Sequence, residues 1–327
     1  MKVLITGAAG FIAPFLAKQC MAYGCTVLGM DHRAPQNSWP EAAFEQCDVR
    51  DGACFSELIA RFAPERVFHL AAQSYPTVSL ARPQETFESN VGGTINLFES
   101  LRTSNLFPTV VVACSSAEYG LVASKDLPVR ETHSLLPLHP YGVSKVAQDL
   151  LAAQYFVNYA IPSVRMRIFN TTGPGKIGDV CSDLTKRAVE IELGMHRPTM
   201  MVGNLTTRRA IIDVRDQVRA LWLSAEHCEY GDVYNIGASD IYSVQEIVEA
   251  IRKQSSANFD VKPHPALVRA ADEPVIAGDT GKFRACCDWT PRIPLSDTLS
   301  DMLAWWRVRL AAPQQGQSLQ QATRSRD

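Results

Sequence analysis

The chain of 327 residues lacks the features that mark several classes of protein. Its net charge of -2 offers no basic surface to attract nucleic acid. No apolar run approaches the roughly 20 residues that a membrane helix needs. The nine cysteines include no Cys-x-x-Cys pair, which predicts reduced thiols of a cytoplasmic protein and no metal site. The first β-rich run begins at Lys2, so we expect no signal peptide.

Short β-rich runs alternate with longer amphipathic stretches in the first half of the chain. This alternation predicts an α/β fold, namely a Rossmann-type doubly wound parallel sheet with helices on both faces. Beyond Asn170, glycine- and proline-rich loops around shorter elements predict a smaller C-terminal α/β substrate domain. The expected strands contain Val3–Ile5, Thr26–Met30, Arg66–Leu70, Thr109–Val112 and Ser163–Ile168.

We therefore expect a sheet domain over residues 1–166, to which a later segment at about 210–235 returns. Residues 167–311 form the expected substrate domain. The final segment, 312–327, is rich in Gln and Ser and is predicted to be a disordered tail.

A glycine-rich turn follows the first expected strand, where Gly7-Ala-Ala-Gly10 opens a helix. Glycine lets the backbone approach a pyrophosphate, and a helix N-terminus offers unpaired amides and positive potential. The turn is a variant of the Gly-x-Gly-x-x-Gly fingerprint. Asp31 ends the next strand, where a carboxylate accepts hydrogen bonds from the hydroxyls of an adenosine ribose. Together these residues predict a dinucleotide cofactor site.

The type of dinucleotide stays open. Asp31 would repel a 2′-phosphate and favours NAD(H), whereas Arg33 would hold that phosphate and favours NADP(H). We prefer NAD(H). Asp48 is a candidate adenine contact, with helix capping as its alternative role.

Three further residues predict hydride chemistry at an alcohol or carbonyl carbon. Tyr141 and Lys145 are four residues apart, so on a helix beginning at Pro140 both side chains share one face. The ammonium should lower the tyrosine pKa from its ordinary value of about 10. Ser115 should end a buried strand, where its hydroxyl holds the same substrate oxygen. Taken alone, a Tyr-x-x-x-Lys spacing is also typical of two solvent-exposed side chains on one helix that have no catalytic role.

Taken together, these motifs resemble the extended short-chain dehydrogenase/reductase family over residues 1–310. The motifs, in chain order, are Gly7-x-x-Gly10, Leu70-Ala-Ala-Gln73, Asn90, Ser115 and Tyr141-x-x-x-Lys145. Within the family, His69–Ser74 and Val202–Leu205 resemble enzymes that act on GDP-mannose derivatives. The resemblance implies an NAD(P)-dependent enzyme with a GDP-linked sugar as substrate.

The resemblance also implies roles for further residues. Asn170 would contact the substrate diphosphate, while Arg209, Arg269 and Asp272 would bind the nucleotide's phosphates and ribose, and Arg208 competes with Arg209. The further cofactor contacts implied are Phe11, Ile12, Val49, Leu70, Ala71, Ala72 and Asn90. The further substrate contacts implied are Gln73, Ser74, Ser116, Ala117, Glu118, Val180 and Asn204.

One position separates the reactions of the resembling enzymes. Dehydratases of the family place a glutamate two residues before the tyrosine of a Ser/Thr-x-x-x-Tyr-Gly stretch, and here that position is Ala117. Glu118 is one residue late, and successive side chains of an extended segment point to opposite sides. We therefore expect reduction of the C4 carbonyl of a GDP-4-keto-6-deoxy-mannose to GDP-rhamnose. The alternatives are an NAD-dependent nucleotide-sugar 4-epimerase, a 4,6-dehydratase that uses Glu118, and a non-enzymatic nucleotide-sugar or redox sensor.

Residues 86–104 and 143–159 are predicted to form amphipathic helices. In the resembling family such helices pair across a twofold axis into a four-helix bundle, so we expect a homodimer. Apolar stripes of this spacing also occur in ordinary cores. No nucleic-acid or membrane partner is expected.

Overall fold

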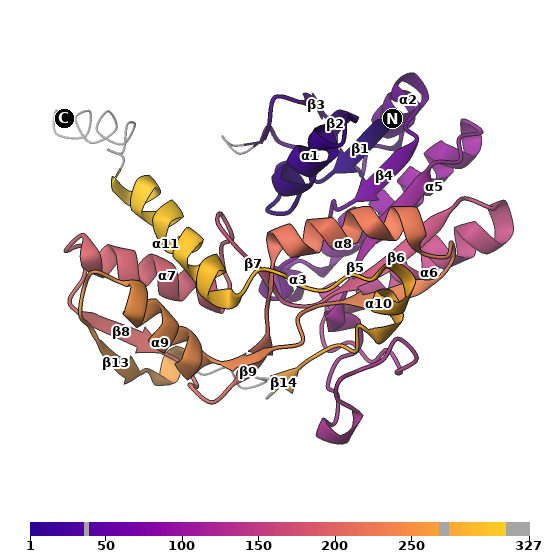
Figure 1. Ribbon diagram of the computed structural model, residues 1–327. Helices are drawn as coiled ribbons and strands as arrows, with labels where there is room; N and C mark the ends of the chain where they lie inside the picture. The colour runs from indigo at the N-terminus through magenta and orange to yellow at the C-terminus, as the bar shows by residue number, and fades with distance from the viewer. Residues whose placement is uncertain (36–38, 268–274, 312–327) are drawn as a thin grey trace, which may run out of the picture. The chain divides into compact units, whose positions relative to one another are not determined.

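The computed structural model describes residues 1–35, 39–267 and 275–311 (Figure 1). The chain divides into two compact units. The first unit comprises Met1–Thr171, Thr207–Tyr242 and Glu273–Pro294, and the second comprises Thr172–Thr206, Ser243–Asp272 and Leu295–Asp327. The predicted tail over 312–327, together with Arg269 and Asp272, lies outside the described residues.

The first unit contains a seven-stranded sheet among the described residues, in the order β11-β6-β5-β4-β1-β2-β3 (Figure 1). Every neighbouring pair in this sheet is parallel. The strands are β1 (Lys2–Thr6), β2 (Thr26–Asp31), β3 (Ala43–Gln46), β4 (Arg66–His69), β5 (Thr109–Ser115), β6 (Ser163–Ile168) and β11 (Val233–Ile236). The doubly wound parallel sheet predicted from the sequence is confirmed.

Alternating strand residues bury both faces of this sheet. Val111 lies in one apolar cluster with residues of the helices α1 (Ala13–Ala22) and α8 (Val214–His227). Val110 and Val112 lie in a second apolar cluster with residues of α2 (Gly52–Phe62), α5 (Gly93–Thr103) and α6 (Pro140–Tyr159). Parallel strands covered on both faces read as near-continuous apolar runs, which is why the strands were visible in the sequence. The helices of the first unit are α1 (Ala13–Ala22), α2 (Gly52–Phe62), α3 (Pro76–Ala81), α4 (Pro83–Phe87), α5 (Gly93–Thr103), α6 (Pro140–Tyr159), α8 (Val214–His227) and α10 (Gly281–Cys287).

Shorter elements connect these helices and strands. A π-helical turn over Glu88–Gly92 joins α4 to α5, so the expected helix over 86–104 is helical but not uniformly α. Short 3-10 turns are η2 (Ser116–Glu118) and η3 (Ser124–Asp126). The short strands outside the main sheet are β7 (Thr171–Thr172), β9 (Arg208–Ala210), β10 (Ile212–Asp213), β12 (Ile241–Ser243) and β14 (Val275–Ile276).

The second unit packs three helices beside a parallel strand pair. The helices are α7 (Val180–Glu192), α9 (Val244–Gln254) and α11 (Leu295–Ala311), and the strands are β8 (Thr199–Val202) and β13 (Asp260–Pro263), followed by the 3-10 turn Pro265–Leu267. Arg307 of α11 donates two hydrogen bonds to Glu192 of α7, at 2.8 and 2.9 Å. This ion pair links two helices of the unit. Among the described residues, no helix is long and apolar enough to cross a membrane.

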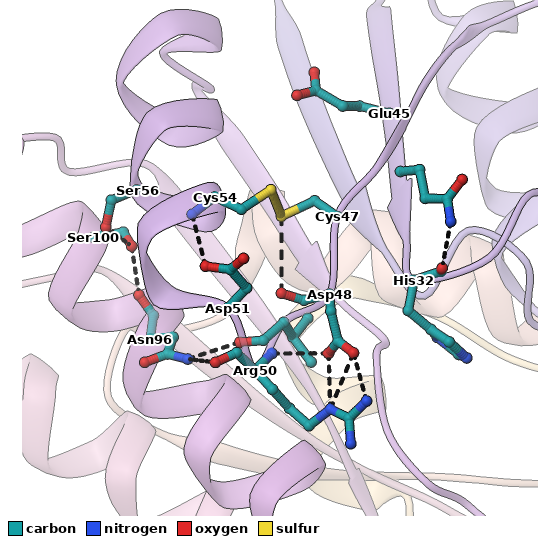
Figure 2. The surroundings of a disulfide bond; sticks show 12 residues. His32, Glu45, Cys47, Asp48, Arg50, Asp51, Cys54, Ser56, Asn96 and Ser100 are labelled. Carbon is teal, nitrogen blue, oxygen red and sulfur yellow. Dashed lines mark hydrogen bonds and ion pairs between the residues drawn. A yellow bond between two sulfur atoms is a disulfide. The ribbon is translucent and has the colours of Figure 1, made fainter.

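The cysteines depart from the sequence-based expectation at one place. Cys47 and Cys54 form a disulfide between the end of β3 and the first turn of α2 (Figure 2). The seven other cysteines are free thiols. The expectation that all nine are reduced is therefore wrong for this pair, because folding of the β3–α2 loop brings together two sulfurs whose spacing matches no disulfide motif.

Candidate functional site

The glycine-rich turn between β1 and α1 is held by hydrogen bonds of its own backbone amides. Gly7 has a φ of +75°, and a Cβ there would lie 2.8 Å from the backbone nitrogen of Ala71, so glycine is required. The Gly7 amide donates to the Met30 carbonyl at 2.8 Å, which fixes the turn against β2. No side chain of the described residues caps α1 at its N-cap, Ile12. This uncapped helix end beside a glycine turn fits the diphosphate of a dinucleotide.

Asp31 lies at the end of β2, beside the same turn. Its Oδ2 accepts the Ala9 amide at 3.0 Å, and its Oδ1 accepts the Arg33 amide at 3.2 Å. The His32 ring nitrogen lies 2.8 Å from Oδ1. Asp31 thus ties the strand end to the glycine turn, at the place where the sequence predicts ribose binding, and the exposed Arg33 and His32 flank it.

The β3–α2 loop contains the predicted adenine contact Asp48 and the implied cofactor contact Val49. Asp48 forms a bidentate ion pair with Arg50, which holds the pKa of its carboxyl below the ordinary value. The cap of α2 is Asp51, which accepts the Cys54 amide at 3.0 Å, so the alternative capping role of Asp48 is wrong. Val49 is buried, and its carbonyl accepts a hydrogen bond from Asn96 at 2.8 Å.

Asn90 lies in the π-helical turn and is fully buried. Its Oδ1 accepts the Gln73 amide at 2.7 Å, and its Nδ2 donates to the Gln73 carbonyl at 3.1 Å and to Ser144 Oγ at 2.8 Å. Because these bonds occupy the side chain, a direct cofactor contact by the Asn90 amide is not supported. Asn90 instead positions the segment after β4, in which Leu70, Ala71 and Ala72 are partly buried.

The predicted catalytic residues meet where β5 ends and α6 begins. Ser115 is the last residue of β5, and Tyr141 is the second residue of α6, with Pro140 as the first. The Ser115 side chain lies near enough to the Tyr141 hydroxyl to lower its pKa. Lys145 is buried one turn further along, 5.9 Å from the centre of the Tyr141 ring, and its ammonium donates to the Ala113 carbonyl at 2.8 Å. The three side chains therefore cluster as the spacing suggests.

The acidity of Tyr141 differs from the sequence-based expectation. Burial raises its pKa to about 12, the Ser115 hydrogen bond opposes this rise, and the Glu118 charge adds to it. Burial also lowers the pKa of Lys145. The expected lowering of the Tyr141 pKa is therefore wrong, because desolvation disfavours the charged form of each group. Tyr141 holds its proton at neutral pH, the form that a general acid requires.

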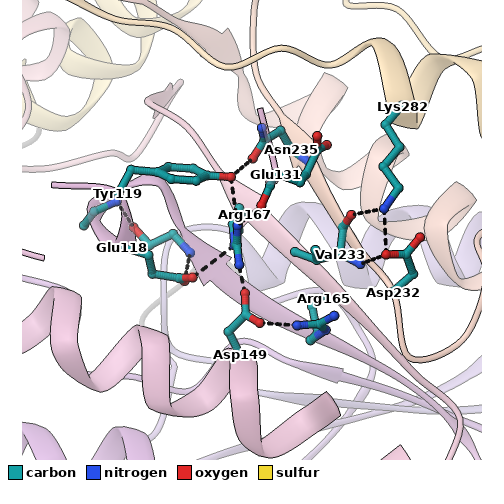
Figure 3. Close-up of polar contacts among 12 residues, drawn as sticks. Glu118, Tyr119, Glu131, Asp149, Arg165, Arg167, Asp232, Val233, Asn235 and Lys282 are labelled. Carbon is teal, nitrogen blue, oxygen red and sulfur yellow. Dashed lines mark hydrogen bonds and ion pairs between the residues drawn. The ribbon is translucent and has the colours of Figure 1, made fainter. Parts of the chain in front are cut away.

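Glu118 belongs to a buried charge cluster (Figure 3). Its Oε1 accepts the Ser115 amide at 2.7 Å, and its Oε2 lies 3.2 Å from Nε of Arg167. Arg167 also donates to Asp149 at 2.9 Å, and Asp149 pairs with Arg165. With 0% of its surface exposed, Glu118 is held by protein groups, and the predicted substrate contact of Glu118 is not supported. The turn aims Glu118 into the protein.

The remaining predicted substrate residues lie in both units. In the first unit, Ser74 is exposed, and Gln73, Ser116, Ala117, Asn170 and Arg209 are partly buried. The Arg209 guanidinium donates to the Arg208 carbonyl at 2.9 Å. In the second unit, Val180 begins α7, and Asn204 Oδ1 accepts the Thr206 amide at 3.0 Å. These roles stay predictions.

A buried polar chain beneath the site was missed in the sequence. Thr6 Oγ1 lies 2.9 Å from Nδ1 of His69 and accepts the Ala71 amide at 3.1 Å. Nε2 of His69 lies 3.1 Å from Thr94, which also accepts from Gln148 at 2.7 Å. Burial lowers the pKa of His69 to about 3, so the ring is neutral. The available signal was one buried polar residue at the end of each strand, β1 and β4.

Comparison with known proteins identifies the family. Residues 4–302 match the family model described as GDP-mannose 4,6 dehydratase. The chain belongs to this family. Its members are extended short-chain dehydrogenases/reductases, the type that includes NAD(P)-dependent nucleotide-sugar dehydratases, reductases and epimerases. The family, the fold class and the enzyme class predicted from the sequence are confirmed.

Individual relatives are similar at modest identity. GDP-6-deoxy-D-mannose reductase of Pseudomonas aeruginosa is 28% identical over 248 residues, covering 76% of this chain and 82% of that protein. UDP-glucose 4-epimerase of Lacticaseibacillus casei is 27% identical over 325 residues, covering 93% and 96%. GDP-mannose 4,6-dehydratase of Yersinia enterocolitica is 24% identical over 350 residues, covering 93% of each protein.

Two solved structures have the same fold. The structure of RMD from Pseudomonas aeruginosa complexed with NADPH has a TM-score of 0.83 at 24% identity, covering 94% of this chain and 99% of that chain. The Thermus thermophilus UDP-glucose 4-epimerase complex with NAD has a TM-score of 0.83 at 26% identity, with the same coverage. At this identity the first likeness concerns the fold alone.

Proposed function

We propose that the protein reduces the C4 carbonyl of a GDP-4-keto-6-deoxy-mannose to give GDP-rhamnose, with NAD(P)H as reductant. The observation that carries this proposal is the placement of Glu118. The carboxylate nearest in sequence to the dehydratase position is buried against Arg167, and Ala117 has no acid–base group. Ser115, Tyr141 and Lys145 then remain for C4 chemistry, which needs no further acid. The 28% identical GDP-6-deoxy-D-mannose reductase supports this choice.

The residues of this chain act on the carbonyl oxygen. A nicotinamide cofactor, when bound, supplies the hydride for C4. Tyr141 donates its proton to the oxygen as negative charge develops there, and its raised pKa keeps that proton in place beforehand. The Ser115 hydroxyl orients the same oxygen by a hydrogen bond. The Lys145 ammonium stabilises the tyrosinate that proton transfer leaves behind, and its bond to the Ala113 carbonyl fixes its position.

The cofactor site favours NADH over NADPH in this proposal. Asp31 places a carboxylate beside the glycine turn, and a 2′-phosphate at that position would meet its negative charge. Arg33 and His32 on the same segment provide a counter-charge, so NADPH is the second choice. The glycine turn and the uncapped α1 would hold the diphosphate.

The test is a coupled measurement on the purified protein. It is incubated with GDP-4-keto-6-deoxy-mannose and either NADH or NADPH, while absorbance of the reduced nicotinamide is followed and the sugar product is identified by NMR. We expect stoichiometric cofactor oxidation and a 6-deoxy sugar reduced at C4. Absence of oxidation with both cofactors would overturn the proposal. A UDP-linked keto sugar, run in parallel, tests the nucleobase.

A matched pair of tyrosine variants tests the role of Tyr141. Tyr141→Phe should lower kcat by about 10²- to 10⁴-fold while the affinity for cofactor is largely retained. Tyr155→Phe on the same helix removes only a hydrogen bond to Glu99, 2.8 Å long, and should leave kcat within about twofold. Equal effects of the two substitutions would contradict proton donation by Tyr141.

A nucleotide-sugar 4-epimerase is the second candidate. The same three residues serve it, Asp31 fits the tightly held NAD that it needs, and UDP-glucose 4-epimerases are 24–28% identical to this chain. Interconversion of GDP- or UDP-sugars without added reductant, by protein that copurifies with NAD, would favour this reading. Release of a 4-keto product from GDP-mannose would instead indicate the dehydratase, the third alternative.

We also propose that the protein is a homodimer. Helix α6 exposes three apolar side chains at seven-residue spacing, namely Val143, Leu150 and Val157, with 42%, 55% and 77% of their surfaces exposed. Ile95 of α5 is exposed as well. This stripe of α6, with α5, suits a two-fold helix–helix contact that buries it.

A further inference from the structure

The Cys47–Cys54 disulfide encloses Asp48, the predicted adenine contact, and Val49, an implied cofactor contact. Cys47 directly follows β3, and Cys54 lies in the first turn of α2, with Asp48 and Val49 between them (Figure 2). The Cα atoms of the two cysteines are 6.3 Å apart, within the range of natural disulfides. The bond therefore closes the loop at the adenine end of the proposed cofactor site.

Non-covalent contacts connect this loop to the rest of the site. The Cys47 amide donates to the Asp31 carbonyl at 3.0 Å, so the first half-cystine adjoins the predicted ribose residue. Asn96 of α5 donates to the carbonyls of Val49 and Arg50, at 2.8 and 3.2 Å. Within the loop, Arg50 holds the Asp48 carboxylate. The disulfide adds a covalent cross-link between the strand side and the helix side of the loop.

The two sulfurs differ in access. Cys47 is buried, whereas Cys54 is partly exposed at the start of α2. A thiolate must reach one sulfur of a disulfide to exchange with it, and accessible disulfides are the labile ones. Exchange therefore begins at the Cys54 sulfur, with the Cys47 sulfur as leaving group.

We propose that Cys47 and Cys54 form a reversible redox site that sets the affinity for the adenine half of NAD(P)H. A dithiol reductant attacks the Cys54 sulfur, and Cys47 leaves as a thiolate and takes up a proton. The second thiol of the reductant then displaces Cys54, which is also protonated, and the reductant departs as its own disulfide. Two electrons pass to the protein, and one sulfur–sulfur bond is exchanged for another.

Opening the bond removes a constraint from the predicted cofactor contacts Asp48 and Val49. In the disulfide form, Asp48 and Val49 are held in place before any ligand arrives, so less ordering is required on binding. In the dithiol form, the cross-link between Cys47 and Cys54 is lost, and the loop between β3 and α2 is held by its backbone and by hydrogen bonds such as those from Asn96. The dithiol form should therefore bind the cofactor more weakly. This inference rests on the proposed use of NAD(P)H.

The experiment measures cofactor affinity in both redox states. One sample of wild-type protein is kept in the disulfide form, and a second is reduced with dithiothreitol, which is then removed under argon. Binding of NADH and NADPH to each sample is followed by nicotinamide fluorescence. We expect the reduced form to bind about three- to tenfold more weakly. Peptide mass spectrometry without reduction should find a Cys47–Cys54 cross-linked peptide in the oxidised form only.

Two double variants provide the controls. Cys47→Ala with Cys54→Ala should bind with the weaker affinity and should not respond to reductant. Cys228→Ala with Cys286→Ala removes another cysteine pair, whose sulfurs lie 3.2 Å apart, and should respond as wild type does. Equal affinity of the two wild-type forms, or absence of the cross-linked peptide, would overturn the redox site while leaving the proposed reductase intact. Binding of NAD(P)H by neither form would overturn both proposals.

Discussion

Asn90 and Gln73 exchange two hydrogen bonds, since the Gln73 amide donates to Asn90 Oδ1 at 2.7 Å and Asn90 Nδ2 donates to the Gln73 carbonyl at 3.1 Å. The Asn90 side chain thus forms hydrogen bonds with both the backbone N–H and the backbone C=O of Gln73, in the segment that follows β4. The third bond, to Ser144 at 2.8 Å, attaches this segment to the helix that carries Tyr141 and Lys145. One buried side chain thus connects the predicted cofactor segment with the catalytic helix.

Replacing Asn90 should therefore cost stability. Asn90→Ala leaves the Gln73 backbone groups without partners in the interior, and we expect the free energy of unfolding to fall by about 1–3 kcal/mol. Urea unfolding followed by circular dichroism measures this change. Asn158→Ala is the control, because its amide bonds only to the Gln154 carbonyl at an exposed position, so its effect should stay within about 0.5 kcal/mol. Similar losses for the two variants would contradict the role of Asn90.

The pH dependence of turnover should reflect a protonated Tyr141. Its pKa is raised to about 12, so the phenol keeps its proton as pH rises through the neutral range and loses it only in strong alkali. For carbonyl reduction we expect a kcat without a falling limb between about pH 6 and 9. Stopped-flow measurement of hydride transfer across that range tests this. A limb centred near neutrality would show that Tyr141 titrates far below its expected value.

The stability contributions of Glu118 and Glu192 should depend on pH with opposite sign. Burial and the Asp149 charge raise the pKa of Glu118 from 4.5 to about 8, so the unfolded carboxyl loses its proton first, and stability falls as pH rises from about 4.5 to 8. Glu118→Gln removes this loss and keeps an acceptor for the Ser115 amide. The thermal midpoint of the variant minus that of the wild type should therefore be larger at pH 8 than at pH 5.

Glu192 supplies the matched comparison. Its hydrogen bond from Arg307 lowers its pKa to about 2, so its contribution to stability is complete above the ordinary value of 4.5 and disappears as pH falls through about 2. Glu192→Gln should lower the thermal midpoint at pH 7, and the deficit should shrink as the solution is acidified. If the difference in thermal midpoint from wild type changed with pH in the same direction for both variants, the assigned pKa shifts of the two carboxyls would be contradicted.

The exposed stripe of α6 makes assembly testable. Leu150→Glu combined with Val157→Lys places charges where Leu150 and Val157 would face a second copy, and should convert a dimer into monomers. Light scattering after gel filtration should give twice the chain mass of 36.0 kDa for wild type and a single mass for the variant. Val308→Lys, at an exposed position of α11, is the control and should leave the mass unchanged. A monomeric wild type at micromolar concentration would contradict the dimer.

Cofactor preference should depend on Asp31. Asp31→Asn retains acceptor and volume but removes the charge, so the ratio of kcat/KM for NADPH to that for NADH should rise, by about tenfold or more. Steady-state kinetics with each cofactor measures the ratio. Asp48→Asn, whose carboxylate is paired with Arg50 on the neighbouring loop, is the control for loss of a negative charge. An unchanged ratio for Asp31→Asn would show that the 2′-phosphate of NADPH does not bind beside Asp31.

Local spacing predicted where several residues of the candidate site lie. Gly7 and Gly10 belong to one turn, and Tyr141 and Lys145 are four residues apart on one helix, so the placement of each pair follows from the sequence without tertiary information. Ser115 was predictable because a buried strand reads as an apolar run that stops there.

Residues whose role depends on distant partners were not predictable. Asn90 meets Ser144 across 54 positions, and Arg167 reaches Asp149 and Glu118 through packing of β6 against β5 and α6. The acidity of Tyr141 depends on how completely the fold removes water, which spacing does not encode.

Ser115 ends β5 and also caps the turn that follows, since its Oγ accepts the Ala117 amide at 3.2 Å and its amide donates to Glu118. One of the two lone pairs of the hydroxyl is thereby used inside the protein, and rotation about the Cα–Cβ bond is restricted. Alanine at position 115 would remove both the hydrogen bond that caps the turn and the hydroxyl proposed to orient the substrate oxygen. Threonine is the substitution that keeps both the capping oxygen and the hydroxyl at position 115.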